Sequence, residues 1–238
     1  MRLSILAVAL LAAAAARPAS AQEDVQGLPL KEIPAQAGAA DYMAVVISGD
    51  GGWIGPAPAV AHRFAEAGAP VVGWNAMSYF LHRRTADELG ADLQRVLRHY
   101  LAAWGKSKAV LVGYSRGADV LPFMVSRLPD DLRSRVELVG LLGPSHTVDF
   151  KLHLSDLFGN SAAKTALPLL PEVARLRGLR LVCVYGSDES DSICPELDRS
   201  TATVIERDGG HHLGGDFRGI AGLLLEDLAP PPGARPTG

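Results

Sequence analysis

Short apolar runs alternate along the chain with longer segments in which apolar residues recur every three or four positions. Continuous apolar runs are typical of strands that are buried on both faces of a parallel sheet. On this basis we expect strands at 42–47, 70–74, 109–112, 136–142, 179–185 and 201–206.

The segments between these runs have the spacing of amphipathic helices. The clearest one begins at Thr85, where Glu88 stands three residues after the cap and completes a capping box. Its apolar stripe runs from Leu89 to Trp104, and Gly105 ends it. Strands and helices alternate in this way along the whole chain. The alternation predicts an α/β fold with a mostly parallel sheet of about six strands and helices on both faces.

The same pattern divides the chain into parts. Residues 22–40 are polar and contain Gly and Pro, and we expect them to form an extended lead-in to one domain at 41–229. Within that domain, residues 144–167 have no clean period, which we interpret as a small cap region. The Pro-rich tail at 230–238 is expected to be disordered.

The first residues have the composition of an export signal. Arg2 precedes a short apolar run, and Ala-Ser-Ala at 19–21 fits the cleavage rule, so residues 1–21 are interpreted as a signal peptide. We therefore expect the mature protein in the periplasm. Loss of the two positive charges of Arg2 and Arg17 changes the formal net charge from −3 to −5. This charge gives no electrostatic basis for binding nucleic acid.

The chain contains two cysteines, Cys183 and Cys194, and both remain after cleavage. An oxidising compartment favours a disulfide between them. A loop of this size would stabilise the fold by about 3 kcal/mol.

One apolar run leads into the motif Gly-Tyr-Ser-Arg-Gly at 113–117, and a helical segment follows directly. This strand–turn–helix context around Gly-x-Ser-x-Gly is the nucleophile elbow of the α/β-hydrolase fold. The two glycines allow the strand and the helix to approach closely around a strained turn. The motif therefore predicts that Ser115 is a catalytic nucleophile.

A serine nucleophile needs a general base, and the sequence offers one after the last predicted strand. Two glycines precede His211 and His212 there, and they give the backbone freedom to aim an imidazole at the serine. His211 is favoured because it directly follows the glycine pair. The chain order of serine, acid and histidine is the order that this fold uses.

The acid that orients the histidine is expected in the loop after the strand at 179–185. Three carboxylates are available there, and we favour Asp191, because Asp-x-x-x-Pro is a common end for such a loop and Cys194 follows closely. Glu189 is the second choice and Asp188 the third. The remaining carboxylates are either solvated or available to a cationic group of the substrate.

The negative oxygen formed during ester cleavage needs hydrogen-bond donors. One is the backbone N–H of Arg116, directly after the nucleophile, and the second is expected from Asp50 or Gly51 in the Gly-rich loop after the first strand. The pattern of a nucleotide-binding P-loop is absent from this loop.

Several bulky and basic residues lie where the strands are expected to end. In an open α/β sheet this edge is the ligand side. The arginine pair there has the chemistry to hold a phosphate, or it forms an ordinary solvated surface. The candidates for substrate binding are Trp53, Trp74, Tyr79, Arg83 and Arg84.

Four stretches together resemble the VirJ/AcvB family of bacterial virulence proteins. They are Ser-Gly-Asp-Gly-Gly-Trp at 48–53, Gly-Tyr-Ser-Arg-Gly-Ala-Asp at 113–119, the loop at 185–194 and Gly-Gly-His-His at 209–212. The resemblance covers about residues 42–228. It implies a periplasmic protein with an α/β-hydrolase fold. The family serine falls on Ser115 and the family histidine on His211, and Asp188, Glu189 and Asp191 all fit the acid.

The resemblance also implies a substrate and partners. The implied activity is hydrolysis of the lysyl ester of lysyl-phosphatidylglycerol, with a link to type IV secretion and virulence. We expect the chain to correspond to the shorter, VirJ-like form without an extra N-terminal domain. We expect an exported serine hydrolase that needs no cofactor or metal and contacts the membrane peripherally. The alternatives are a generic periplasmic carboxylesterase or thioesterase, and a non-catalytic partner of a secretion system.

Overall fold

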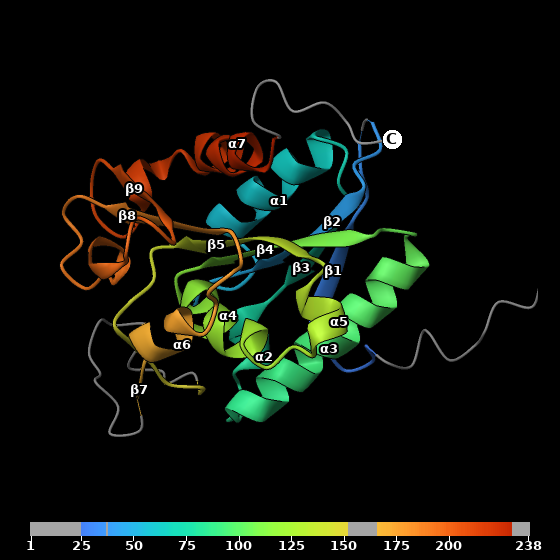
Figure 1. Cartoon of the computed structure of the whole chain (residues 1–238), viewed down its shortest axis with the longest axis horizontal. Coiled ribbons are helices and arrows are strands. Elements are labelled where there is room, and N and C mark those ends of the chain that lie inside the picture. Colours follow the sequence, from blue (N-terminus) through green and yellow to red (C-terminus); the bar gives the residue numbers. More distant parts are fainter. Residues whose placement is uncertain (1–24, 37, 152–165, 230–238) are drawn as a thin grey trace, which may run out of the picture.

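A sheet of seven strands forms the centre of the molecule, in the order β1-β3-β2-β4-β5-β8-β9 (Figure 1). The structure, a computed structural model, describes residues 25–36, 38–151 and 166–229. The strands are β1 (Leu30–Ile33), β2 (Tyr42–Ile47), β3 (Val71–Trp74), β4 (Lys108–Tyr114), β5 (Val136–Leu142), β8 (Leu181–Gly186) and β9 (Thr203–Arg207).

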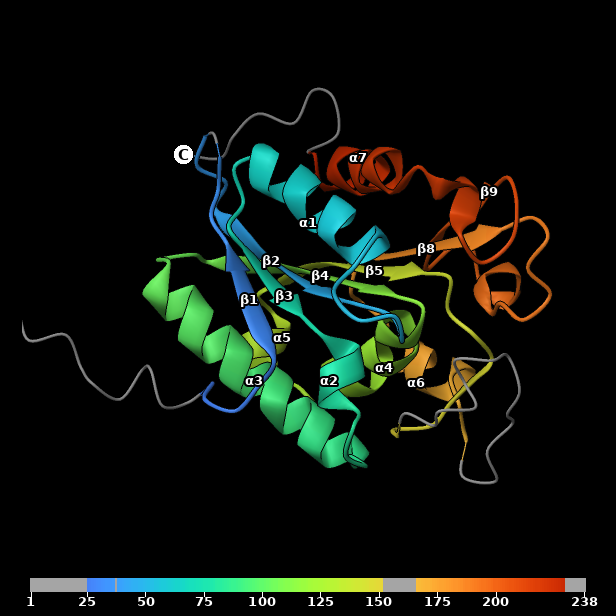
Figure 2. The same ribbon diagram turned by 180° about the vertical axis from the view of Figure 1, so that it is seen from behind.

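Six strands of this sheet pair in parallel, as the apolar runs predict: β2, β3, β4, β5, β8 and β9. The seventh strand, β1, pairs antiparallel with β3 at the edge of the sheet (Figure 2). It lies in the segment 22–40, which was expected to be an extended lead-in. Its two middle residues, Lys31 and Glu32, are exposed, as is usual for an edge strand, so no apolar run marks it. The sheet therefore begins before residue 41.

Helices cover both faces of the sheet, which confirms the predicted layering (Figure 1). Helices α1 and α7 pack on one face, and α3 and α4 lie on the other with the shorter helices beside them. The helices are α1 (Pro56–Glu66), α2 (Ala76–Tyr79), α3 (Ala86–Ala103), α4 (Arg116–Val125), α5 (Asp130–Arg133), α6 (Leu170–Ala174) and α7 (Phe217–Leu228).

Two apolar cores result, one on each face of the sheet. Along β4, Val110 and Val112 contribute to the core under α1 and α7, whereas Leu111 contributes to the core under α3 and α4. This alternation follows from the two-residue period of a strand. It explains why the central strands read as continuous apolar runs.

The predicted capping box at the start of α3 is present. Thr85 Oγ1 accepts a hydrogen bond from the backbone N–H of Glu88 at 3.2 Å, and Glu88 Oε2 accepts one from the backbone N–H of Thr85 at 2.7 Å. The box satisfies two N–H groups at the end of the longest helix among the described residues.

Between β5 and α6, two short strands, β6 (Thr147–Val148) and β7 (Leu167–Pro168), pair antiparallel at the position of the predicted cap. Residues 152–165 of that segment lie outside the described residues, as do the predicted signal peptide and the Pro-rich tail. Within the described ranges, no helix has the length and apolar character needed to cross a lipid bilayer.

Candidate active site

Ser115 lies between β4 and α4 with φ 53° and ψ −122°, a conformation that L-residues rarely adopt. The close approach of the neighbouring chain makes the motif glycines necessary. A Cβ on Gly113 would lie 2.2 Å from the carbonyl oxygen of Gly117, and a Cβ on Gly117 would lie 2.3 Å from that of Ile47. The turn thus has the geometry of a nucleophile elbow, as the motif predicts.

His211 reaches the serine from the loop after β9. Its Nε2 lies 2.8 Å from Ser115 Oγ, within hydrogen-bond distance. His212 points elsewhere, with its Nδ1 3.4 Å from the hydroxyl of Tyr114. The structure therefore brings together the serine and the histidine that the sequence favours.

The carboxylate beside this histidine is Glu189, and the preference for Asp191 is wrong. Glu189 Oε1 lies 2.5 Å from His211 Nδ1, and Glu189 Oε2 accepts a hydrogen bond from the backbone N–H of Gly186 at 3.3 Å. Asp191 instead contacts His146, with 2.6 Å between Oδ1 and Nδ1. Asp188 accepts a hydrogen bond from the neighbouring Ser187 hydroxyl.

The path of the loop explains the choice of acid. The backbone N–H of Glu189 donates to the carbonyl of Gly186, so a tight turn directly after β8 keeps Glu189 beside the neighbouring strand ends. Two residues later the chain has left that turn, and the side chain of Asp191 is 69% exposed, against 7% for Glu189. Asp-x-x-x-Pro spacing does not encode this turn.

The contact with Glu189 also affects the protonation of His211. The hydrogen bond that the imidazole donates to the carboxylate raises the pKa of His211 above its usual value, because it stabilises the charged imidazolium, while burial opposes the change. In a serine-hydrolase triad, the third member is a carboxylate that stabilises the imidazolium in this way.

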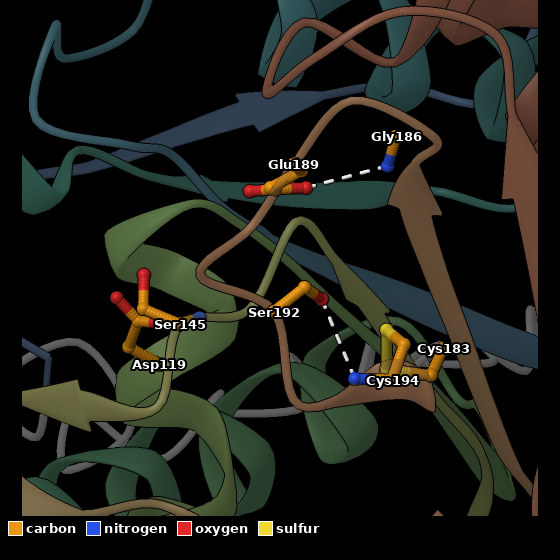
Figure 3. The surroundings of a disulfide bond; sticks show 7 residues. All are labelled: Asp119, Ser145, Cys183, Gly186, Glu189, Ser192 and Cys194. Carbon is orange, nitrogen blue, oxygen red and sulfur yellow. Dashed lines mark hydrogen bonds between the residues drawn. A yellow bond between two sulfur atoms is a disulfide. The ribbon is translucent and has the colours of Figure 1, made fainter. Parts of the chain in front are cut away.

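The predicted disulfide is present and closes the loop that carries Glu189. Cys183 in β8 and Cys194 in the 3₁₀-helix η3 (Cys194–Glu196) are joined by an S–S bond of 2.08 Å (Figure 3). Ser192 Oγ accepts a hydrogen bond from the backbone N–H of Cys194 in the same turn (Figure 3). The disulfide and the turn at Gly186 hold the two ends of the segment that contains Glu189.

The Gly-rich loop after β2 lies directly against Ser115. A Cβ on Gly49 would be 3.1 Å from Ser115 Cβ. Ser48 Oγ fixes the start of the loop by accepting a hydrogen bond from the backbone N–H of Ala76 at 3.0 Å. The residues expected to donate to an oxyanion, Asp50 and Arg116, follow Gly49 and Ser115 directly. Their role as donors remains a prediction, as does that of Gly51.

The candidate substrate-binding aromatics have packing roles instead. Trp74 and Tyr79 are buried in the core, and the Tyr79 hydroxyl donates to Asp92 at 2.5 Å. Trp53 covers β3, where a Cβ on Gly73 would lie 2.3 Å from its ring. The expectation that these rings face a ligand is not supported by their contacts.

The two arginines do not form a pair that faces one anion. Arg83 Nη1 and Nη2 donate to Asp149 at 3.0 and 3.4 Å. The guanidinium of Arg84 lies over the ring of Tyr79, 4.6 Å from its centroid. Each arginine therefore has its own protein partner in the structure.

Sequence reasoning did not single out Asp119, which lies one helical turn after Ser115. Its Oδ1 accepts a hydrogen bond from the backbone N–H of Ser145 at 2.7 Å (Figure 3). Burial raises the pKa of Asp119 to about 7. The sequence does contain a signal for this residue. A carboxylate within a mostly apolar helix is costly to bury, so its presence indicates a specific partner.

A comparison with known protein families gives one match. The family model described as bacterial virulence protein (VirJ) matches residues 41–230. None of the curated protein sequences matches the chain.

Solved structures with the same fold are α/β hydrolases. Est1E from Butyrivibrio proteoclasticus is 13% identical with a TM-score of 0.61, and the match covers 86% of this chain and 97% of that one. Esterase PE8 is 19% identical with a TM-score of 0.58, and the match covers 85% and 99%. An alpha-beta serine hydrolase homologue from Coxiella burnetii is 15% identical with a TM-score of 0.56, over 84% and 91%. At these identities the likeness shows the fold.

Proposed function

The chain belongs to the VirJ family, and from that premise we propose that it is a serine hydrolase that cleaves an ester through Ser115, His211 and Glu189. One observation supports this proposal above the others. A single imidazole contacts the serine hydroxyl at 2.8 Å through one nitrogen and a buried carboxylate at 2.5 Å through the other. This arrangement lets a weak nucleophile lose its proton as it attacks.

The proposed reaction follows from the positions of these groups. Ser115 Oγ bonds to the ester carbonyl carbon while its proton moves to His211 Nε2, and Glu189 stabilises the resulting imidazolium. The backbone N–H groups of Arg116 and Asp50 donate to the carbonyl oxygen as it becomes negative. The ester C–O bond then breaks, and the leaving alcohol takes the proton from His211. A water molecule then attacks the acyl carbonyl carbon while its proton moves to His211. The bond to Ser115 Oγ breaks, Ser115 takes the proton back from His211, and the acid is released.

For the substrate, we propose the lysyl ester of lysyl-phosphatidylglycerol at the outer face of the inner membrane. The resemblance to the VirJ/AcvB family supports this choice. Exposed apolar side chains near the Gly-rich loop also suit contact with lipid. The exposed fraction is 68% for Ile54, 36% for Met77 and 61% for Leu81.

The positions of two of these side chains relate them to the catalytic loop. Ile54 Cδ1 lies 3.7 Å from the position of a Cβ on Gly51, and Met77 Cε lies 3.3 Å from that of a Cβ on Gly52. Peripheral insertion of these side chains would bring an ester in the headgroup region towards Ser115. Export to the periplasm and a link to type IV secretion components are part of the same proposal.

The contacts in the structure change which residues we assign to the lysyl ammonium group and to the phosphate of the substrate. Glu189 is occupied by His211, so Asp188 is the carboxylate of this loop that we assign to the lysyl ammonium group. Arg83, whose side chain is 49% exposed beside Asp149, is the candidate for the lipid phosphate. Asp188→Asn should then reduce the preference for a cationic acyl group, and unchanged preference would refute that assignment. Lipid turnover that is unchanged in Arg83→Gln would refute the phosphate contact.

The substrate is tested with purified mature protein and vesicles that contain lysyl-phosphatidylglycerol. The proposal predicts release of free lysine by the wild-type protein and none by Ser115→Ala. Turnover of p-nitrophenyl butyrate without release of lysine would instead indicate a generic carboxylesterase or thioesterase. Absence of both activities from a folded protein would favour a non-catalytic partner of a secretion system.

A further inference from the structure

The side chains of Arg116 and Asp50 form an ion pair next to the nucleophile. Arg116 Nε donates to Asp50 Oδ1, and Nη2 donates to Oδ2 at 3.1 Å, so both carboxylate oxygens are engaged. The third guanidinium nitrogen, Nη1, donates to the backbone carbonyl of Asp149 at 2.6 Å. A two-point arginine–carboxylate contact fixes orientation as well as distance.

The arginine of this pair is buried, which needs a physical reason. Its side chain is 8% exposed, and that of Asp50 is 28% exposed. Taking a charge out of water is costly, and a well-packed apolar residue is often as stable as a buried ion pair. Overall stability alone therefore gives little reason for an arginine at this position, directly after the serine.

The two residues belong to separate segments that meet at the reacting centre. Arg116 is the first residue of α4, and Asp50 lies in the Gly-rich loop after β2. Their backbone N–H groups are the two donors that the proposed reaction needs for the oxyanion. The same two residues are thus joined through their side chains.

The ion pair adds a restraint to the Gly-rich loop from outside the loop. Gly52 and Gly55 adopt positive φ values of 75° and 59°. Within the loop, the backbone N–H of Gly52 donates to the carbonyl of Gly49. At the start of the loop, Ser48 Oγ accepts a hydrogen bond from the backbone N–H of Ala76. The carboxylate of Asp50 connects this loop to the first residue of α4. Useful donors must be held within about 0.5 Å of the productive geometry.

We propose that the ion pair between Arg116 and Asp50 is a positioning pair that sets the spacing of the two backbone donors of the oxyanion hole. This inference rests on the proposed hydrolase function and deepens it. The guanidinium and the carboxylate do not touch the substrate. They act through the amides of their own residues, so their loss affects the transition state more than substrate binding.

The test is a double-mutant cycle with Arg116→Gln, Asp50→Asn and the double variant, assayed on p-nitrophenyl butyrate. Each single variant should lower kcat by about 100-fold with little change in KM, as for loss of one oxyanion donor. The double variant should be no worse than either single variant, because each one already breaks the pair. Arg116→Lys should recover part of kcat, since lysine keeps the charge but not the two-point geometry.

A second readout separates positioning from a purely structural role. A boronic acid that forms a tetrahedral adduct with the serine should lose affinity in the variants in parallel with kcat. All assays are run below the melting temperature of every variant. Arg98→Gln is the matched control, because Arg98 makes a similar two-point contact with Asp131 on the surface, at 2.9 and 3.3 Å.

The possible failures are distinguishable. If the wild-type protein shows no turnover that depends on Ser115, the proposed function itself is wrong. If the wild-type protein is active and the variants at 50 and 116 keep their kcat and their boronate affinity, the positioning pair alone is refuted. Additive losses in the double variant would also refute a pair that acts as one unit.

Discussion

Glu189 and His211 meet at 2.5 Å, between a carboxylate oxygen and Nδ1, while the opposite side of the imidazole faces Ser115. Because Nδ1 is held by the carboxylate, Nε2 is the nitrogen that is available to take the proton of the serine. The position of the acid therefore determines which nitrogen of the base is active.

The first prediction concerns the identity of this acid. Glu189→Gln should lower kcat for an ester substrate by about 100-fold or more, since the imidazolium loses its stabilising charge. Asp191→Asn is the matched control and should change kcat by less than about threefold, because Asp191 contacts His146 and not His211. Steady-state kinetics on both variants decides the matter. A larger loss in the Asp191 variant would contradict the assignment.

The second prediction concerns pH. In the proposed reaction the neutral form of His211 accepts the serine proton, and the hydrogen bond that His211 donates to Glu189 raises the pKa of His211 above its usual value. The rate should therefore increase with pH through a midpoint above the usual pKa of a histidine. In Glu189→Gln the midpoint should move to lower pH, because the charge that stabilises imidazolium is gone. The pH profile of kcat/KM in both proteins measures this shift, and identical midpoints would count against it.

The third prediction concerns the disulfide between Cys183 and Cys194. Reduction, or a Cys183→Ser and Cys194→Ser double variant, should cost about 3 kcal/mol of folding free energy. For a chain of this size the loss corresponds to a decrease in melting temperature of about 6–12 °C. Activity should also fall at temperatures below the transition, because the segment that holds Glu189 becomes less restrained. Thermal unfolding with and without a reductant tests this, and the double variant should not respond to the reductant.

The fourth prediction concerns the buried carboxyl of Asp119. Burial raises its pKa to about 7 in the folded protein, against 3.8 for the free group. Between these values the folded state holds a proton that the unfolded state has lost, so this group's contribution to stability decreases as pH rises from about 4 to 7. The slope reaches at most about 1.4 kcal/mol per pH unit.

Asp119→Asn tests this contribution, since the amide oxygen can still accept the hydrogen bond from Ser145. The free energy of unfolding, measured with urea at pH 5 and pH 8, should decrease more in the wild-type protein than in the variant. Parallel pH dependence in the two proteins would show that the carboxyl does not titrate in this range.

Local patterns made much of the fold and the centre of the site predictable. The elbow at Ser115 requires two glycines at fixed spacing, and the capping box at Thr85 has its own fixed spacing, so both can be read from short stretches. The central strands are buried on both faces and therefore appear as apolar runs. His211 follows two glycines after the last such run.

The errors concern features that depend on neighbouring chain segments. Glu189 and Asp191 differ by the tight turn at Gly186, which spacing does not show. β1 belongs to the sheet through its pairing with β3 and lacks an apolar run of its own. Likewise, Trp74 and Tyr79 end in the core, because β3 and α2 are covered by other elements. Asp50 and Arg116 were expected only as backbone donors, since their ion pair joins residues that are far apart in the sequence.

The central claim is that Ser115 is an activated nucleophile. The most direct measurement is labelling of the purified mature protein with a fluorophosphonate probe, with Ser115→Ala as the control. We predict labelling of the wild-type protein that is lost in Ser115→Ala and strongly slowed in a folded His211→Ala variant. A well-folded wild-type protein that does not react with the probe would contradict the account.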